Sequence, residues 1–269
     1  MVQPLKLVDL NEDVLEKIFS YLDIQDLVNV VNSDKEYLNS SRSAFKRKYR
    51  GTCIQMPFVS NEVDPTQQCV SNVELLRYFG ESMSILEFCF DCNHPNAQRI
   101  FHLVVTYCRE TLTELKMSHL SSVGFPLNKS FTKVRKLTFS RGNPNLPSSQ
   151  LAEWFPSLEI LVIDSIEDVL WLLKSSQKIS SLKCLSIDIT NEHFDRANIR
   201  DLNKFIAMNT QLNETCLSLR DYNDHHFNEP QLPNLHDDLP DDYILRYYYR
   251  SPNLVNYSTV FPNETAFTL

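Results

Sequence analysis

A six-residue pattern, apolar-x-x-apolar-x-apolar, recurs along the middle of this 269-residue chain and constrains its fold more than any other feature. Five copies start at residues 85, 112, 134, 158 and 182, at intervals of 27, 22, 24 and 24 residues, and a looser copy ends at Leu219. Residues two apart point to the same side of a strand. Each copy therefore predicts a short strand with one buried face, and the even spacing predicts that these strands belong to equivalent units.

Most of the intervals between the copies carry apolar residues at helical spacing. These stripes lie at Ile100–Cys108, Leu151–Phe155, Val169–Leu173 and Ile199–Ile206. One strand and one helix cannot bury both their apolar faces alone, so neighbouring units are expected to stack into a parallel sheet with helices on one side. Buried strands of an ordinary α/β domain remain the alternative, although they would not explain the constant spacing.

The pattern and its period resemble the leucine-rich repeat, whose units are 20–29 residues long. Asn93 supplies the asparagine of that motif in the first copy, and the later copies lack it. The resemblance implies an α/β fold in which residues 51–225 form a solenoid, with a curved parallel sheet and helices on its convex face. The last residues, 226–269, are predicted to be an acidic loop followed by an aromatic C-terminal cap.

The N-terminal residues form two short helical stripes that are apolar on more than one side. Val14, Leu15, Ile18, Phe19 and Leu22 make up the first stripe, and the second follows Asp23, which is a good helix N-cap. About 40 residues cannot bury this much apolar surface by themselves. We therefore expect part of it to face another protein.

The run from Leu10 to Leu38 resembles the F-box, the helical module that docks on the Skp adaptor of cullin-based ubiquitin ligases. Asn11 replaces the usual proline, and the segment after Val31 departs from the family pattern. The resemblance implies an F-box domain over residues 1–50, with Leu15, Phe19 and Val28 shared with the core. It implies the adaptor-binding residues Leu10, Ile18, Leu22, Leu27 and Val31. The alternative is an ordinary helical pair that packs only on its own domain.

Alternate positions of each predicted strand point away from the helices. Ile160 and Val162 put two apolar side chains at such positions, and a basic pair precedes them by one repeat. An apolar spot beside a basic one is typical of a protein-docking surface. The candidate substrate-binding residues are Lys116, Arg135, Lys136, Ile160 and Val162. A loop or the C-terminal tail covering Ile160 and Val162 is the alternative.

Composition excludes several function classes. The net charge of −8 argues against nucleic acid as a partner, and no run of 18 apolar residues predicts a membrane span. The four glycines are scattered, so no phosphate-binding loop or dinucleotide turn is expected. The spacing of the seven cysteines shows no disulfide framework, and the first residues do not have the layout of a secretory signal. We therefore expect the protein to be located in the cytoplasm or nucleus. We expect no catalytic residue and no cofactor.

One cluster could hold a metal. Cys89 and Cys92 lie two residues apart, with His94, His102 and Cys108 nearby, and such ligands could build a tetrahedral zinc site. Buried structural cysteine is the interpretation that we favour, because Cys108 lies on an apolar helical stripe.

Together the two resemblances imply the substrate-receptor subunit of a Skp–cullin–F-box (SCF) ubiquitin ligase. Its partners would be a Skp-type adaptor, a cullin ligase bound through that adaptor, and a protein substrate. Two other classes stay open: a leucine-rich-repeat scaffold without a ligase role, and a metal-dependent protein that uses the Cys89 cluster.

Overall fold

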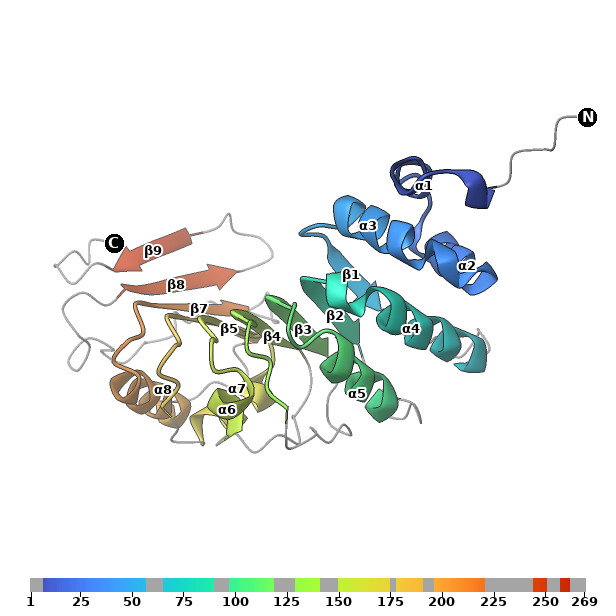
Figure 1. The fold of residues 1–269 in the computed structure, drawn as a ribbon. Coiled ribbons are helices and arrows are strands. Elements are labelled where there is room, and N and C mark those ends of the chain that lie inside the picture. The colour runs from blue at the N-terminus through green and yellow to red at the C-terminus, as the bar shows by residue number, and fades with distance from the viewer. Residues whose placement is uncertain are drawn as a thin grey trace, which may run out of the picture. The chain divides into compact units, whose positions relative to one another are not determined.

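The computed structural model describes the chain in nine stretches. They are residues 7–56, 65–89, 97–118, 129–140, 150–174, 178–190, 196–220, 244–250 and 257–261. The chain forms two compact units, Met1–Leu115 and Lys116–Leu269 (Figure 1). This division falls inside the segment predicted as one solenoid. The expected domain boundaries after residues 50 and 225 stay predictions.

The first unit begins with helices and continues with strands that alternate with helices. Its elements are η1 (Leu7–Asp9), α1 (Glu12–Phe19), α2 (Ile24–Ser33), η2 (Lys35–Tyr37), α3 (Leu38–Lys48), β1 (Cys53–Met56), α4 (Pro65–Phe79), η3 (Gly80–Ser82), β2 (Ile85–Cys89), α5 (Ala97–Tyr107) and the start of β3 (Glu114–Ser118). β1 and β2 pair in parallel, with Cys53 opposite Ile85.

Side chains at the helix starts explain where α1 and α2 begin. Oδ1 of Asn11 accepts a hydrogen bond from the N–H of Val14 at 2.9 Å, and Oδ1 of Asp23 accepts one from the N–H of Asp26 at 2.8 Å. Each bond satisfies a donor that has no partner within its own helix. Asn11 is therefore the N-cap of α1.

Aromatic rings fill the core of the first unit. Phe45 of α3 stacks on Phe79 of α4 with 4.7 Å between ring centroids, and Phe19 of α1 meets Tyr37 edge-on at 5.7 Å. α1 is also tied to α3 at the surface, where an ion pair of 3.1 Å joins Arg47 to Glu16. α1 and α2 thus share one core with α3 and α4.

The second unit is a sheet whose strands follow one another in chain order. Its elements are the rest of β3, then β4 (Lys136–Ser140), α6 (Leu151–Trp154), β5 (Ile160–Ile163), α7 (Ile166–Leu173), β6 (Cys184–Thr190), α8 (Arg196–Met208), β7 (Glu214–Arg220), β8 (Ile244–Arg250) and β9 (Tyr257–Phe261). Strands β4 to β8 pair in parallel, and α6, α7 and α8 lie on one side of them (Figure 1). This confirms the predicted α/β fold class at the level of a parallel sheet with helices.

The C-terminal segment departs from an all-parallel arrangement. The aromatic run that was predicted as a cap forms β8 beside β7, and β9 pairs with β8 in the antiparallel direction. Six residues separate Arg250 from Tyr257. A parallel crossover needs about a dozen residues or more, whereas an antiparallel return does not.

The same hydrogen-bond pattern is repeated where successive strands of the second unit begin. The carbonyl oxygen of Arg135 accepts bonds from the N–H groups of Glu159 and Ile160, both at 2.8 Å. The carbonyl of Glu159 does the same for Lys183 and Cys184, at 2.8 and 2.9 Å. This repetition fixes the register, so that equivalent residues of successive strands lie in straight rows across the sheet.

Candidate functional site

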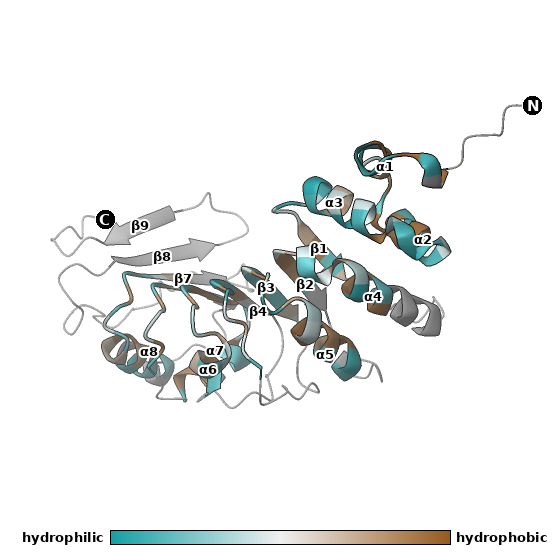
Figure 2. Ribbon diagram, in the orientation of Figure 1, coloured by the Kyte–Doolittle hydropathy of each residue, from teal (hydrophilic) through white to brown (hydrophobic). Residues whose placement is uncertain are grey.

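A groove on the outer side of α1 is the first candidate site. It has a volume of about 640 Å³ and its lining mixes apolar and polar side chains: Asn11, Asp13, Val14, Lys17, Ile18, Tyr21 and Leu22. Val14, Ile18 and Tyr21 are 42%, 39% and 79% exposed. The mixture of hydrophobic and hydrophilic residues along α1 is visible in Figure 2.

The groove exists because α1 is apolar on two sides. Leu15 and Phe19 point into the core, and Val14 and Ile18 each precede one of them by one position. One residue is a rotation of about 100° on a helix, so the second pair lies outside the core. Val14 and Tyr21 were not among the predicted binding residues. Val14 lies four residues before Ile18, on the same side of α1. Tyr21 follows the end of α1, and its N–H donates to the carbonyl of Ile18 at 3.2 Å.

The structure divides the five predicted adaptor-binding residues. Ile18 is exposed, and Leu10 and Leu22 are half-buried. Leu27 and Val31 are 0% exposed. The prediction that they lie on a partner-facing surface is therefore corrected, because both side chains are part of the core. The reason is that α2 packs against both α3 and α4, and this packing uses its apolar stripe within the chain.

A polar network fastens α2 to α4. Nδ2 of Asn32 donates to Oε2 of Glu74 at 2.9 Å, while the hydroxyl of Tyr78 donates to Oδ1 of Asn32 at 2.8 Å. The ammonium of Lys35 donates to the same hydroxyl and lies 4.2 Å from the centroid of the Tyr78 ring. Nε of Arg42 donates to the Tyr78 carbonyl at 2.7 Å. These bonds hold the end of α2 against α4.

The second candidate site is the open face of β4–β6, which is the face opposite α6, α7 and α8 (Figure 1). One row across this face joins Lys136, Ile160 and Cys184, and the next joins Thr138, Val162 and Ser186. Ile160 is 36% exposed and Val162 is half-buried. The structure therefore brings Lys136, Ile160 and Val162 together as the sequence predicted.

Charged side chains lie where these strands begin. Arg135 and Lys183 are exposed and both reach Glu159, at 4.0 and 3.3 Å. Lys116, the remaining predicted substrate-binding residue, is half-buried on β3. The basic character expected beside the apolar spot is present, and it comes from the two repeats on either side of β5.

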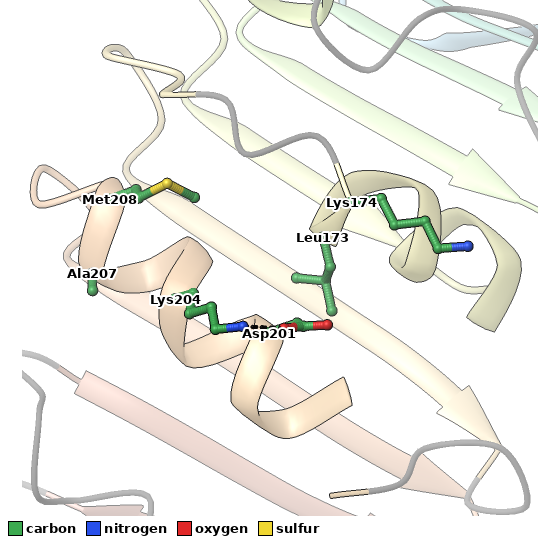
Figure 3. A pocket seen from close by; sticks show the side chains of 6 residues that line it. All are labelled: Leu173, Lys174, Asp201, Lys204, Ala207 and Met208. Atoms are coloured by element: carbon green, nitrogen blue, oxygen red, sulfur yellow. Dashed lines mark hydrogen bonds and ion pairs between the residues drawn. The ribbon is translucent and has the colours of Figure 1, made fainter. Parts of the chain in front are cut away.

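A further hollow of about 520 Å³ lies between α7 and α8 (Figure 3). Its lining combines apolar and charged side chains: Leu173, Lys174, Asp201, Lys204, Ala207 and Met208. Lys204 and Asp201 form an ion pair of 2.8 Å within this lining. Both side chains are largely exposed, at 65% and 49%, so the pair is an ordinary surface ion pair.

The predicted metal alternative falls mainly outside the described residues, which omit Cys92 and His94 and the side chain of Cys89. Burial, and secondarily the charge of Glu81, raises the pKa of the Cys108 thiol to about 12. A neutral thiol is a poor metal ligand because metals bind the thiolate. Among the described residues, no group of three or more His, Cys, Asp or Glu side chains is placed to hold a metal.

No protein-family model and no curated protein matches this chain. In the stretches that the structure describes, no helix is long and apolar enough to cross a membrane.

Proposed function

We propose that this chain is the substrate-receptor subunit of an SCF-type ubiquitin ligase. The observation that carries the proposal is the apolar groove on α1, where Val14, Ile18 and Tyr21 are exposed together. Contiguous apolar surface of this kind is typical of a protein interaction site. It lies within the segment that resembles the F-box, so a Skp-type adaptor is the partner that we assign to it.

The surroundings of the groove favour a rigid docking element. α1 is capped by Asn11 and held to α3 by the ion pair of Arg47 with Glu16, and the backbone carbonyl of Leu22 accepts a 2.7 Å hydrogen bond from Lys48. A partner that binds a pre-ordered helix loses little conformational entropy. The adaptor would then cover the side of α1 that the core leaves open.

The stacked strand-and-helix units support the second half of the proposal. We propose that they are leucine-rich repeats, and that the open face of β4–β6 holds the substrate through Arg135, Lys136, Ile160 and Val162. The mechanism is proximity, because holding a substrate beside a ubiquitin-loaded enzyme raises its effective concentration. In this proposal the chain itself contributes no catalytic residue and no cofactor.

The burial of Leu27 and Val31 favours a second candidate function. A repeat scaffold whose N-terminal helices pack on its own chain would use these residues as the structure does. Such a scaffold would bind proteins through the sheet without recruiting a ligase.

Co-purification of the full chain with a Skp adaptor distinguishes these two functions. We expect Ile18→Asp to lower adaptor binding by about tenfold or more, because it places a charge at the centre of an apolar contact. Ile160→Asp is the matched control, since it makes the same change at a similarly exposed isoleucine of the second unit. Failure of the unaltered chain to bind the adaptor, or equal binding by both variants, would favour the scaffold.

A further inference from the structure

Exposed apolar side chains gather in one part of the first unit. Of the five large hydrophobic residues that are exposed in the described stretches, four lie between residues 7 and 21: Leu7, Val14, Ile18 and Tyr21. α1 packs against α3 and is the outermost helix of this unit (Figure 1). Free energy is gained when such a surface is buried against another molecule, because apolar area is removed from water.

The groove on α1 is lined by two ridges of side chains. Val14 and Ile18 form an apolar ridge, and Asp13 and Lys17 form a charged ridge beside it, with four residues between the members of each pair. The groove between two such ridges accepts a ridge of another helix, and the two helices then cross at about −50°. The shape of the site therefore fits a helix that carries an apolar ridge of its own.

The charged ridge has no partner within the described part of the chain. Asp13 and Lys17 are exposed, and their side chains form no ion pair or hydrogen bond with the described residues. They are the two charged residues in the lining of the groove. The other carboxylates of α1 lie outside that lining, where Glu16 pairs with Arg47. The groove thus presents one anion and one cation, one helical turn apart.

We infer that a second copy of this chain occupies the groove, with the two α1 helices antiparallel about a twofold axis. Asp13 of each copy then faces Lys17 of the other, so the ion pair forms twice. The apolar ridge of Val14 and Ile18 enters the groove of the partner copy. Charge complementarity argues for this occupant, because a uniformly acidic or basic partner is repelled by one of the two charges.

The dimer should be weak. One eight-residue helix and the turns beside it offer less surface than the roughly 800 Å² per partner of a standard stable interface. Self-association goes beyond the proposed function, although a Skp-type adaptor would need the same groove. Free chains would therefore pair, and adaptor binding would separate them.

Sedimentation equilibrium of the full chain, over about a hundredfold range of concentration, should show a monomer–dimer equilibrium. Asp13→Lys alone, or Lys17→Asp alone, should weaken the dimer at least about fivefold, because like charges then face each other. An equimolar mixture of these two variants should regain a dimer at least as tight as that of the unaltered chain. In the mixture both facing pairs are again opposite in sign.

Mixing also controls for damage to the fold, because a misfolded variant is not restored by a second one. Asp26→Lys is the matched control for Asp13→Lys, since Asp26 is an exposed aspartate in the first turn of α2 and does not line the groove. It should leave the dimer unchanged. Ile18→Asp should abolish the dimer, whereas Ile160→Asp should leave it intact.

A chain that stays monomeric over the whole concentration range would overturn the inference. A dimer that survives Ile18→Asp would do so as well, and so would a mixture of the two charge variants that stays monomeric although each is folded. Adaptor co-purification is scored separately. A monomeric chain that binds the adaptor loses this inference and keeps the proposed function, whereas a dimer that ignores the adaptor does the reverse.

Discussion

Close packing fixes residue 80 as glycine. A β-carbon added there would lie 2.8 Å from Cβ of Tyr107 and 3.0 Å from Sγ of Cys108, where α4 and η3 meet the end of α5. Cβ of Tyr107 is attached directly to the backbone and cannot rotate away. Gly80→Ala should therefore lower the free energy of unfolding by about 1–3 kcal/mol, as measured by chemical denaturation.

Gly51 provides the control for this substitution, since space around it is open and its φ is 70°. Gly51→Asn should change stability by no more than about 0.5 kcal/mol, because asparagine tolerates the left-handed region. Equal effects at both glycines would contradict the packing explanation.

The thiol of Cys108 should be unreactive in the folded chain. Burial raises the pKa of its thiol to about 12, so at pH 8 it holds its proton, while Cys53, Cys184 and Cys216 are half-buried. Alkylation with iodoacetamide, followed by mass spectrometry, should label those three before Cys108. In denaturant Cys108 should react at a similar rate to the others.

The same raised pKa predicts a loss of stability at alkaline pH. The pKa of the unfolded thiol is near the ordinary 9.0, whereas burial raises the pKa of the folded thiol to about 12. Between these values the folded state binds more protons, so this contribution to stability is complete below pH 9 and falls as the pH rises towards 12. Cys108→Ala should lessen this alkaline loss in pH-dependent denaturation curves, and an unchanged slope would contradict it.

At the scale of elements, local side chains decide where helices begin. Asp23 caps α2 through the N–H of Asp26. Asp23→Ala should lower the free energy of unfolding by about 1 kcal/mol, and Asp23→Ser should restore most of it because serine also caps well. Chemical denaturation of both variants is the measurement, and equal loss in the two would contradict a capping role.

A buried polar residue shows where the repeat departs from its own pattern. Phe131, Phe155 and Ile179 each lie buried three residues before the apolar position that opens a strand copy. The pairing of Ile187 with Leu217 makes Leu212 the equivalent of Leu182, so the buried Asn209 is the equivalent of Ile179. Its Oδ1 accepts from the N–H of Ile179 at 2.7 Å, and its Nδ2 donates to the carbonyl of Phe205 at 2.8 Å. The side chain thus joins one repeat to the next.

Asn209→Leu should lower stability even though it restores the apolar pattern. It leaves the buried N–H of Ile179 without this acceptor, which costs about 1–3 kcal/mol. Asn213→Leu, at an exposed asparagine of the same turn, is the control and should have little effect. Hydrogen exchange at Ile179 should speed up in the first variant alone.

At the scale of the whole molecule, the stability of each strand-and-helix repeat depends on the repeats on either side of it. Leu161 is fully buried in β5 and lies between Leu137 and Leu185 of the adjoining strands. In stacked repeats stability comes from neighbouring interfaces, so Leu161→Ala should raise hydrogen exchange in β4 and β6 as well as in β5. Val162→Ala, on the open face of the same strand, should leave exchange in β4 and β6 nearly unchanged.

The sequence alone indicated where strands β2 to β7 and helices α1, α2, α5, α7 and α8 lie, which side of the repeated strands faces inward, and that Asp23 caps a helix. It did not identify β8 and β9 as strands. These features depend on periodicity and on side chains within a few residues, so they can be predicted locally. Only the tertiary structure decided which part of each apolar stripe is exposed to solvent. Leu27 and Val31 of α2 are buried where α2 packs against α3 and α4, whereas Val14 and Ile18 of α1 are exposed. Whether a side chain is buried depends on both of the elements that pack together. A periodic pattern shows that one face of an element is apolar, but it does not show which element covers that face.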